Sequence, residues 1–178
     1  GDTDKLLLST DNSKVYIIDA SNLETIATLT ITDSNSNCSH SSSDHDLVAI
    51  AIGYDRDVAF VVDQTDNTVH VIDTVDHVTL DTDSGLSGTN PLCIDSSENN
   101  NINDIVVTRV ADPSSELRGF VTGDDGVSVF DADPTNLEII DQDSGLAGDQ
   151  AIVTSQNPVH IAASSYSDAY LYVANADG

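Results

Sequence analysis

Basic side chains are scarce in this sequence. Five of its 178 residues are Lys or Arg, against 31 Asp and Glu, so the formal net charge is −26. Nucleic acids and anionic membranes are bound through Lys and Arg that neutralise phosphate. The composition therefore excludes both as partners. Salt or bound cations would relieve the self-repulsion of such an acidic surface, which favours a halophilic or marine protein.

Long apolar runs are also missing. No stretch approaches the roughly 18 residues needed to cross a bilayer, so we expect no membrane span. No signal peptide is visible, although a chain that begins Gly-Asp-Thr-Asp is compatible with a processed or trimmed product. Hydrophobic residues nevertheless make up 39% of the sequence. That fraction is enough for a packed core and argues against disorder.

Motifs for common catalytic mechanisms are absent as well. The sequence has no Gly-x-Ser-x-Gly nucleophile motif and no glycine-rich phosphate loop followed by Lys. Carboxylate pairs are so frequent that none stands out as an acid and base pair. We therefore assign no catalytic residue and no organic cofactor, and we favour a protein that is not an enzyme.

Two cysteines, Cys38 and Cys93, are the smallest set that can pair. In a secreted protein they would form a disulfide, which stabilises by about 4 kcal/mol for a loop of this size. In a cytosolic protein they would remain small apolar thiols. Asn37 begins the glycosylation sequon Asn-Cys-Ser, which has meaning in a secreted chain. The predicted disulfide and the predicted glycosylation site therefore both depend on an extracellular location.

The strongest positive feature is a repeat. Val15–Asp19, Val69–Asp73 and Val127–Asp131 are three versions of one apolar run that ends in Asp. Each follows another apolar run that is closed by a polar turn. The copies recur at about 55 to 60 residues, which fits one four-stranded propeller blade with generous loops.

The local pattern favours an all-β fold, because the apolar runs are short, β-branched and separated by Asp, Asn, Gly and Ser. We predict a β-propeller of four-stranded antiparallel blades, with about three blades visible in a segment of a larger propeller. The predicted strands are 5–10, 14–19, 23–31, 47–54, 57–63, 69–73, 77–82, 104–110, 118–122, 127–131, 137–141, 158–164 and 169–175.

These strands make the whole chain, 1–178, a single propeller segment with an incomplete blade at each end. The last strand, Ala169–Ala174, would leave a strong pairing edge, and proteins rarely leave such edges bare. We expect the remaining blades of a longer chain, or a neighbouring subunit, to cover it. The predicted units are a partial blade at 1–31, full blades at 46–88 and 104–148, and a partial blade at 157–178.

The final stretch, Asn157–Gly178, resembles the opening of a YVTN-type β-propeller repeat. Its hallmark is Tyr172-Val-Ala-Asn175, and the usual continuation of that repeat resembles Asn67-Thr-Val-His-Val-Ile-Asp73. The insertion at 89–117 departs from the usual blade length. The resemblance implies a secreted or surface-anchored propeller of surface-layer-like proteins. It implies no single chemistry, because such a scaffold carries its function in the loops.

Two acidic turns are candidate calcium sites. Asp81 and Asp83 precede Ser-Gly, as do Asp141 and Asp143, and two carboxylates so spaced can converge on one hard cation. A third oxygen ligand and a distal Glu are missing from both. The alternative is a tight acidic turn that recurs because the blade recurs.

Histidines suggest a second kind of metal chemistry. His40 and His45 lie in a segment with Cys38, Asp44 and Asp46, a spacing that zinc or copper would accept on a loop. A flexible Ser-rich connection between blades is the alternative. Three further histidines, His70, His77 and His160, lie in or beside predicted strands. We interpret His70 as a cross-strand packing residue, and His160 could face the central channel.

The sequence thus favours a non-enzymatic, extracellular or cell-surface β-propeller that acts as a structural scaffold or binding module. Its acidic loops would hold cations, and its partner would be a protein or a glycan. The alternative is a propeller enzyme or redox domain, lactonase-like or metal-dependent, with its site in the axial channel.

Overall fold

The computed structural model describes eleven parts of the chain, and these form strands, turns and bends. No helix long and apolar enough to cross a membrane occurs in them. The described residues are 4–10, 12–32, 44–53, 57–80, 91–94, 101–109, 116–134, 137–140, 152, 157–164 and 170–176.

The first half of the chain forms two antiparallel sheets. Sheet 1 has the order β1-β2-β3, and sheet 2 has the order β4-β5-β6-β7, with β8 pairing to β6 as well. The strands are β1 (Lys5–Ser9), β2 (Lys14–Asp19), β3 (Thr25–Thr30), β4 (Leu47–Ile52), β5 (Val58–Asp63), β6 (Thr68–Asp73), β7 (Val78–Thr79) and β8 (Leu92–Cys93).

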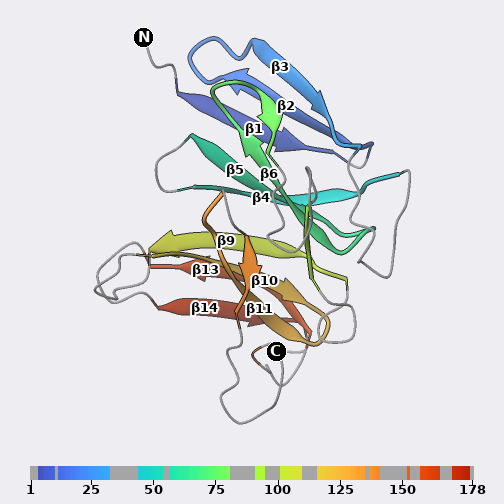
Figure 1. The fold of residues 1–178 in the computed structure, drawn as a ribbon, viewed down its shortest axis with the longest axis vertical. Helices are drawn as coiled ribbons and strands as arrows, with labels where there is room; N and C mark the ends of the chain where they lie inside the picture. The colour runs from blue at the N-terminus through green and yellow to red at the C-terminus, as the bar shows by residue number, and fades with distance from the viewer. Residues whose placement is uncertain are drawn as a thin grey trace.

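The rest of the chain forms two further antiparallel sheets. Sheet 3 has the order β9-β10-β11-β12, and sheet 4 is the antiparallel pair β13-β14. The strands are β9 (Asp104–Arg109), β10 (Leu117–Gly123), β11 (Gly126–Asp131), β12 (Glu138–Ile139), β13 (Pro158–Ala163) and β14 (Leu171–Asn175). The sheets follow one another in chain order, and the first strands β4, β9 and β13 lie next to one another (Figure 1).

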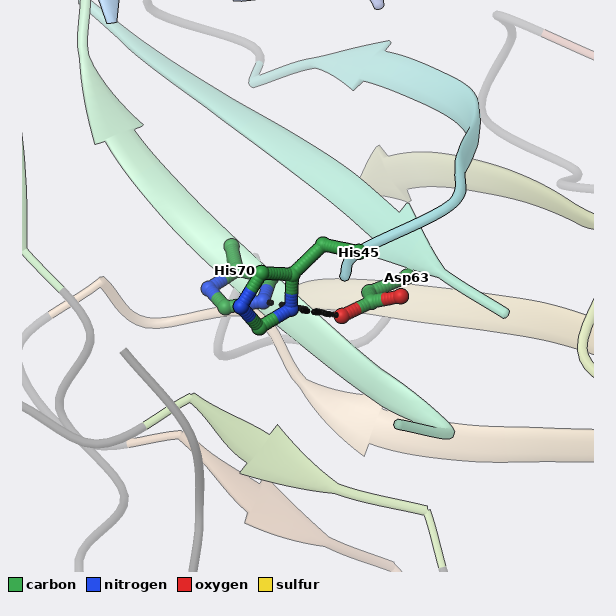
Figure 2. Close-up of side chains that lie close together, drawn as sticks. All are labelled: His45, Asp63 and His70. Atoms are coloured by element: carbon green, nitrogen blue, oxygen red, sulfur yellow. Dashed lines mark hydrogen bonds and ion pairs between the residues drawn. The ribbon is translucent and has the colours of Figure 1, made fainter. Parts of the chain in front are cut away.

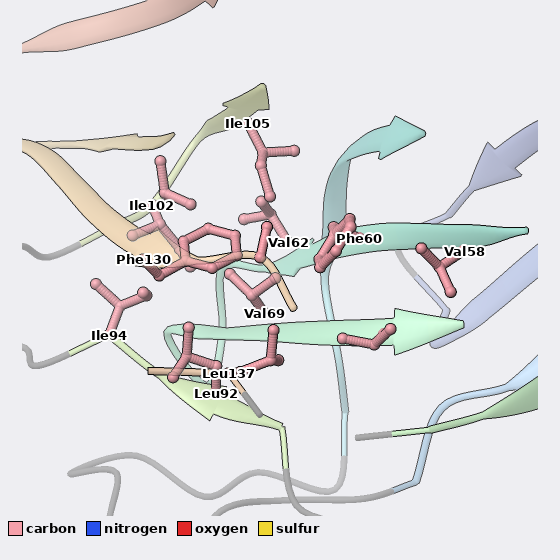
Figure 3. Close-up of a cluster of buried hydrophobic side chains, with 13 residues drawn as sticks. Val58, Phe60, Val62, Val69, Leu92, Ile94, Ile102, Ile105, Phe130 and Leu137 are labelled. Atoms are coloured by element: carbon pink, nitrogen blue, oxygen red, sulfur yellow. The ribbon is translucent and has the colours of Figure 1, made fainter. Parts of the chain in front are cut away.

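The central strands of sheet 2, β5 and β6, are buried on both faces. All six residues of β5 are buried. Because side chains alternate along a strand, Phe60 and Val62 point to one face and Ala59 and Val61 to the other. The first pair packs against sheet 3, where the rings of Phe60 and Phe130 lie 6.0 Å apart (Figure 3). The second pair packs against sheet 1.

The Asp that ends β2, β6 and β11 accepts the same local hydrogen bond in all three sheets. Oδ1 of Asp19 accepts the N–H of Ser21 at 2.8 Å, and Oδ1 of Asp73 accepts the N–H of Val75 at 2.7 Å. Oδ1 of Asp131 likewise accepts the N–H of the residue two positions on, at 3.2 Å. Such a bond mimics a backbone turn, which explains why Asp recurs here.

The predicted inner strands agree closely with the structure, whereas the outermost strands are shorter than predicted. The outer edge of β6 is shared: Ile72 and Asp73 pair with β7, and Thr68 and Val69 pair with β8. The strand predicted over 77–82 therefore contains two paired residues among those described. The insertion at 89–117 contributes β8, which the sequence pattern did not predict.

Candidate functional site: a buried cluster of histidine and aspartate

Two histidines and one aspartate meet inside sheet 2, and we call His45, Asp63 and His70 the His–Asp cluster (Figure 2). Asp63 is the last residue of β5, His70 lies within β6, and His45 precedes β4 by two residues. His45 is 2% exposed, and the other two are 0% exposed. Ionisable side chains are rarely buried this fully unless they are paired.

The backbone of His45 is held by two hydrogen bonds to Ser13, which lies between β1 and β2. Its N–H donates to Oγ of Ser13 at 3.1 Å, and the N–H of Ser13 donates to its carbonyl oxygen at 3.1 Å. The next residue is bonded to sheet 2, since the N–H of Asp46 donates to Oγ1 of Thr65 at 3.2 Å. The carbonyl oxygen of Asp46 accepts the N–H of Gln64 at 2.9 Å. The segment that carries His45 is thus held between the two sheets.

Asp63 is oriented by the turn that it opens. Its register partner is Thr68, so 64–67 form the connection between β5 and β6. Oδ1 of Asp63 accepts the N–H of Thr65 at 3.0 Å and that of Asp66 at 3.4 Å. Because the turn holds Oδ1, the second oxygen, Oδ2, is directed toward the imidazoles.

The three side chains converge on one point. Oδ2 of Asp63 lies 2.6 Å from Nδ1 of His45 and 3.7 Å from Nε2 of His70. The two imidazole rings are nearly perpendicular, with centroids 5.9 Å apart. Two neighbours complete the surroundings. Oδ2 of Asp66 lies 3.6 Å from Nδ1 of His45, and Oγ1 of Thr68 lies 3.3 Å from Nε2 of His70.

The surroundings favour a charged Asp63. Burial by itself raises the pKa of this carboxyl group, but the neighbouring imidazole of His70 and the hydrogen bond with His45 outweigh burial and lower the pKa below its usual value. A carboxylate with two imidazoles can do two things chemically. It can form a buried hydrogen-bonded ion pair, or it can bind a transition metal.

The cluster does not recur with the strand repeat. The repeat aligns His70 with Tyr16 in sheet 1 and with Ser128 in sheet 3. In sheet 3 the register position of Asp63 is held by Gly123, which pairs with Gly126 across a two-residue loop. Among the described sheets, this combination therefore belongs to sheet 2, and the strand fold does not require it.

Of the segment in which the sequence suggested metal ligands, the structure describes Asp44, His45 and Asp46. His45 points into the cluster, whereas Asp44 is exposed. Our interpretation of His70 as a packing residue was incomplete, because its ring nitrogen lies beside Asp63. His160 is 79% exposed, with Nδ1 3.3 Å from Oδ2 of Asp104.

Several predicted sites lie outside the described residues. These are the calcium candidates Asp81, Asp83, Asp141 and Asp143, the glycosylation candidate Asn37, and Cys38 and His40. Cys93 is described and is disulfide-bonded. Its predicted partner, Cys38, is the other of the two cysteines in the sequence.

Sequence reasoning overlooked Asp63, although a signal was present. The stretch 57–62 is too continuously apolar for a sheet with one exposed face, and the residue that follows it is a carboxylate. His70 stands in a second strand of the same kind. An ionisable side chain in a buried strand needs a hydrogen-bonding or charged partner. Asp63 and His70 lie in neighbouring strands, so each can serve as the partner of the other.

Comparison with solved structures decides the fold. The chain is similar to a chain of the hydrazine synthase of Kuenenia stuttgartiensis, with a TM-score of 0.58 and 13% identity over 88% of this chain. It is also similar to a chain in a crystal structure of the mitotic checkpoint complex, with a TM-score of 0.59 and 14% identity over 97% of this chain.

The chain has the fold of a β-propeller segment. At this level of identity the likeness concerns the fold alone. The chain covers 35% and 43% of the two matched chains, less than half of either. No protein-family model and no curated protein matches this sequence.

Proposed function

We propose that this chain is part of a larger, non-enzymatic β-propeller that serves as a scaffold and binding module outside the cell or at its surface. Further blades of the same polypeptide would cover its two terminal sheets. Its loops would then contact a protein or a glycan. The predicted YVTN-type repeat and the predicted calcium sites belong to this proposal.

The observation that carries the proposal is the exposure of apolar side chains on the terminal sheets. Leu6 and Leu8 of β1 are 51% and 52% exposed, and Tyr172 of β14 is 64% exposed. The repeat aligns β1 with β5, whose residues are all buried. An exposed apolar sheet face of this kind is typical of a surface that another sheet covers.

Two other features support the location. Cys93 is disulfide-bonded, and disulfides persist in oxidising compartments such as the cell exterior. The net charge of −26 suits a saline medium, where counterions screen the repulsion between carboxylates. The disulfide fits an extracellular protein better than a cytosolic one, and the charge fits a saline medium.

The alternative function, a propeller enzyme, draws on His160 and Asp104. They lie on the first strands of neighbouring sheets, as a site in the axial channel would require. However, Oδ2 of Asp104 also accepts the N–H of Ile161 at 3.1 Å. Asp104 therefore joins sheet 3 to sheet 4, and this structural task favours the scaffold.

The proposal is tested by charged substitutions on the terminal faces in the full-length protein. If further blades cover these faces, Leu8→Asp and Tyr172→Asp bury an unpaired carboxylate, and each lowers the free energy of unfolding by about 3 kcal/mol or more. Val75→Asp is the matched control, because Val75 is 56% exposed in the turn between β6 and β7. The control is expected to change stability by at most about 0.5 kcal/mol.

Urea unfolding followed by circular dichroism measures all three variants. Equal and small effects of Leu8→Asp, Tyr172→Asp and Val75→Asp would show that the terminal faces are open to solvent, and the proposal would be wrong.

A further inference from the structure

We propose that the His–Asp cluster binds one zinc ion, which fastens the segment before β4 to the strands of sheet 2. Each of the three residues offers one ligand atom, and these atoms lie within 4.8 Å of one another. Oδ2 of Asp63 is paired with Nδ1 of His45 and Nε2 of His70, so these are the proposed ligand atoms. This proposal does not depend on the proposed function, because the ligands are side chains of this chain and no partner of the protein contributes to the site.

The spacing of the ligand atoms suits zinc. Tetrahedral zinc binds nitrogen and oxygen at about 2.0 to 2.2 Å, which separates neighbouring ligand atoms by roughly 3.4 Å. The distances from Oδ2 of Asp63 to the two imidazole nitrogens, 2.6 and 3.7 Å, lie on either side of this value. Small side-chain movements therefore suffice to admit the ion.

The chemistry of the donors selects the class of metal. Two imidazoles and one carboxylate suit zinc and similar first-row transition metals. Calcium and magnesium prefer oxygen ligands and would leave the two imidazoles unused. The cluster thus differs in kind from the Asp-rich turns for which the sequence suggested calcium.

The surrounding contacts hold two of the ligands in place before any metal binds. The turn bonds to Oδ1 fix the Asp63 carboxylate, and the two bonds to Ser13 fix the backbone of His45. Hydrogen bonds of this kind to metal ligands strengthen metal affinity. Nε2 of His70 would exchange its contact with Thr68 for the metal.

The position of the cluster indicates a structural role for the metal. All three ligands are buried, so no substrate can approach the ion as it does in an open catalytic site. A further carboxylate, that of the buried Asp66, has its Oδ2 3.6 Å from Nδ1 of His45. Zinc would join β5 and β6 of sheet 2 to the segment before β4, and His45 in that segment is hydrogen-bonded to Ser13 between β1 and β2.

The test measures zinc binding by the full-length protein, refolded from denaturant with and without zinc. Excess magnesium is present throughout, because the acidic surface binds divalent cations without selectivity. We expect one zinc per chain by equilibrium dialysis and a higher Tm with zinc, since a ligand bound by the native state stabilises it. Failure of the refolded native protein to retain zinc overturns the proposal.

Variants locate the site. Asp63→Asn keeps an acceptor for the turn but removes the charge, and His70→Gln removes one imidazole. Each is expected to weaken zinc binding by about 100-fold or more. His160→Gln is the matched control, because it removes an exposed histidine outside the cluster. Unchanged zinc affinity in folded His70→Gln protein would overturn the proposal.

Cobalt provides a measurement that does not depend on the folding of variants. Cobalt(II) bound to the native protein is expected to give the visible absorption of a tetrahedral ion and paramagnetically shifted proton signals from two histidine rings. A spectrum of octahedral cobalt without shifted histidine signals would show that the metal binds surface carboxylates, and it would leave the cluster as a hydrogen-bonded ion pair.

Discussion

Gly119 of β10 and Phe130 of β11 face each other across sheet 3, and the aromatic ring occupies the space that a Cβ on Gly119 would need. Phe130 is fully buried and also contacts Phe60 of sheet 2. The glycine therefore allows a large ring to fold back over its own sheet and still fill the interface with the neighbouring sheet.

The first prediction concerns this pair. Gly119→Ala is expected to lower the free energy of unfolding by about 1 to 3 kcal/mol, because the methyl group overpacks a filled core. Urea unfolding measures the loss. In a Phe130→Leu background the same change should cost much less, since residues in contact are coupled. Equal losses in the two backgrounds would show that the ring is not the cause.

The sequence predicted the inner strands well because each is a β-branched run between turn-forming residues. The outer strands could not be bounded in this way. Pairing along the outer edge of β6 is divided between β7 and β8, two strands of two residues each, and a pair of residues has no periodicity to read. The pairing of β8 with β6 depends on how the rest of the chain folds, and the two residues of β8 do not specify it.

The candidate site was predicted only in part, for a related reason. His45 was singled out, but with the ligands of its own segment. Asp63 and His70 join it from a strand end and a strand interior, and only the pairing of β5 with β6 brings these together. Linear spacing indicates a metal site when the ligands share a loop. It does not when they come from three elements.

The second prediction concerns the repeated turn aspartate. Oδ1 of Asp73 accepts the N–H groups of Val75 and Asp76 at 2.7 and 2.8 Å. Asp73→Ala is expected to destabilise by about 1 kcal/mol, because both donors lose their acceptor. Asp73→Asn keeps an oxygen acceptor and should lose less. Asp76→Ala removes the same charge from an exposed residue. Equal thermal stability of Asp73→Ala and Asp76→Ala would contradict this role.

The third prediction concerns pH. The hydroxyl of Ser21, and then its N–H, donate to Oδ1 of Asp19 and lower the pKa of Asp19 below 3.8, against a smaller opposing effect of burial. A carboxyl group with a lowered pKa stabilises the folded state above its unfolded pKa, and this contribution disappears as the pH falls through the folded pKa.

The Tm of the native protein should therefore exceed that of Asp19→Asn near pH 6, and the difference should shrink as the pH falls below about 4. Carboxyl carbon NMR titration of Asp19 provides a direct check. A titration midpoint above 3.8 would contradict the stated direction.

The last prediction concerns the contact between sheets 2 and 3. Gln64 lies in the turn after β5, and its Nε2 donates to the carbonyl oxygen of Ile102 at 3.3 Å and to Oδ1 of Asn103 at 2.8 Å. Gln64→Ala is expected to destabilise by about 1 kcal/mol, because it removes the donor shared by these two acceptors. Gln64→Glu should cost at least as much, since a carboxylate beside the Ile102 carbonyl repels it.

Hydrogen exchange at the N–H of Asn103, which donates to the carbonyl oxygen of Thr122 at 2.8 Å, reports the local effect. Both variants should speed this exchange relative to the N–H of Ile31, which is bonded to Ser13 in sheet 1. Local opening exposes an amide at a free energy below that of global unfolding, so a loosened sheet contact acts on nearby amides first. Equal acceleration at both amides would instead indicate a global loss of stability, and Gln64 would then have no specific role between sheets 2 and 3.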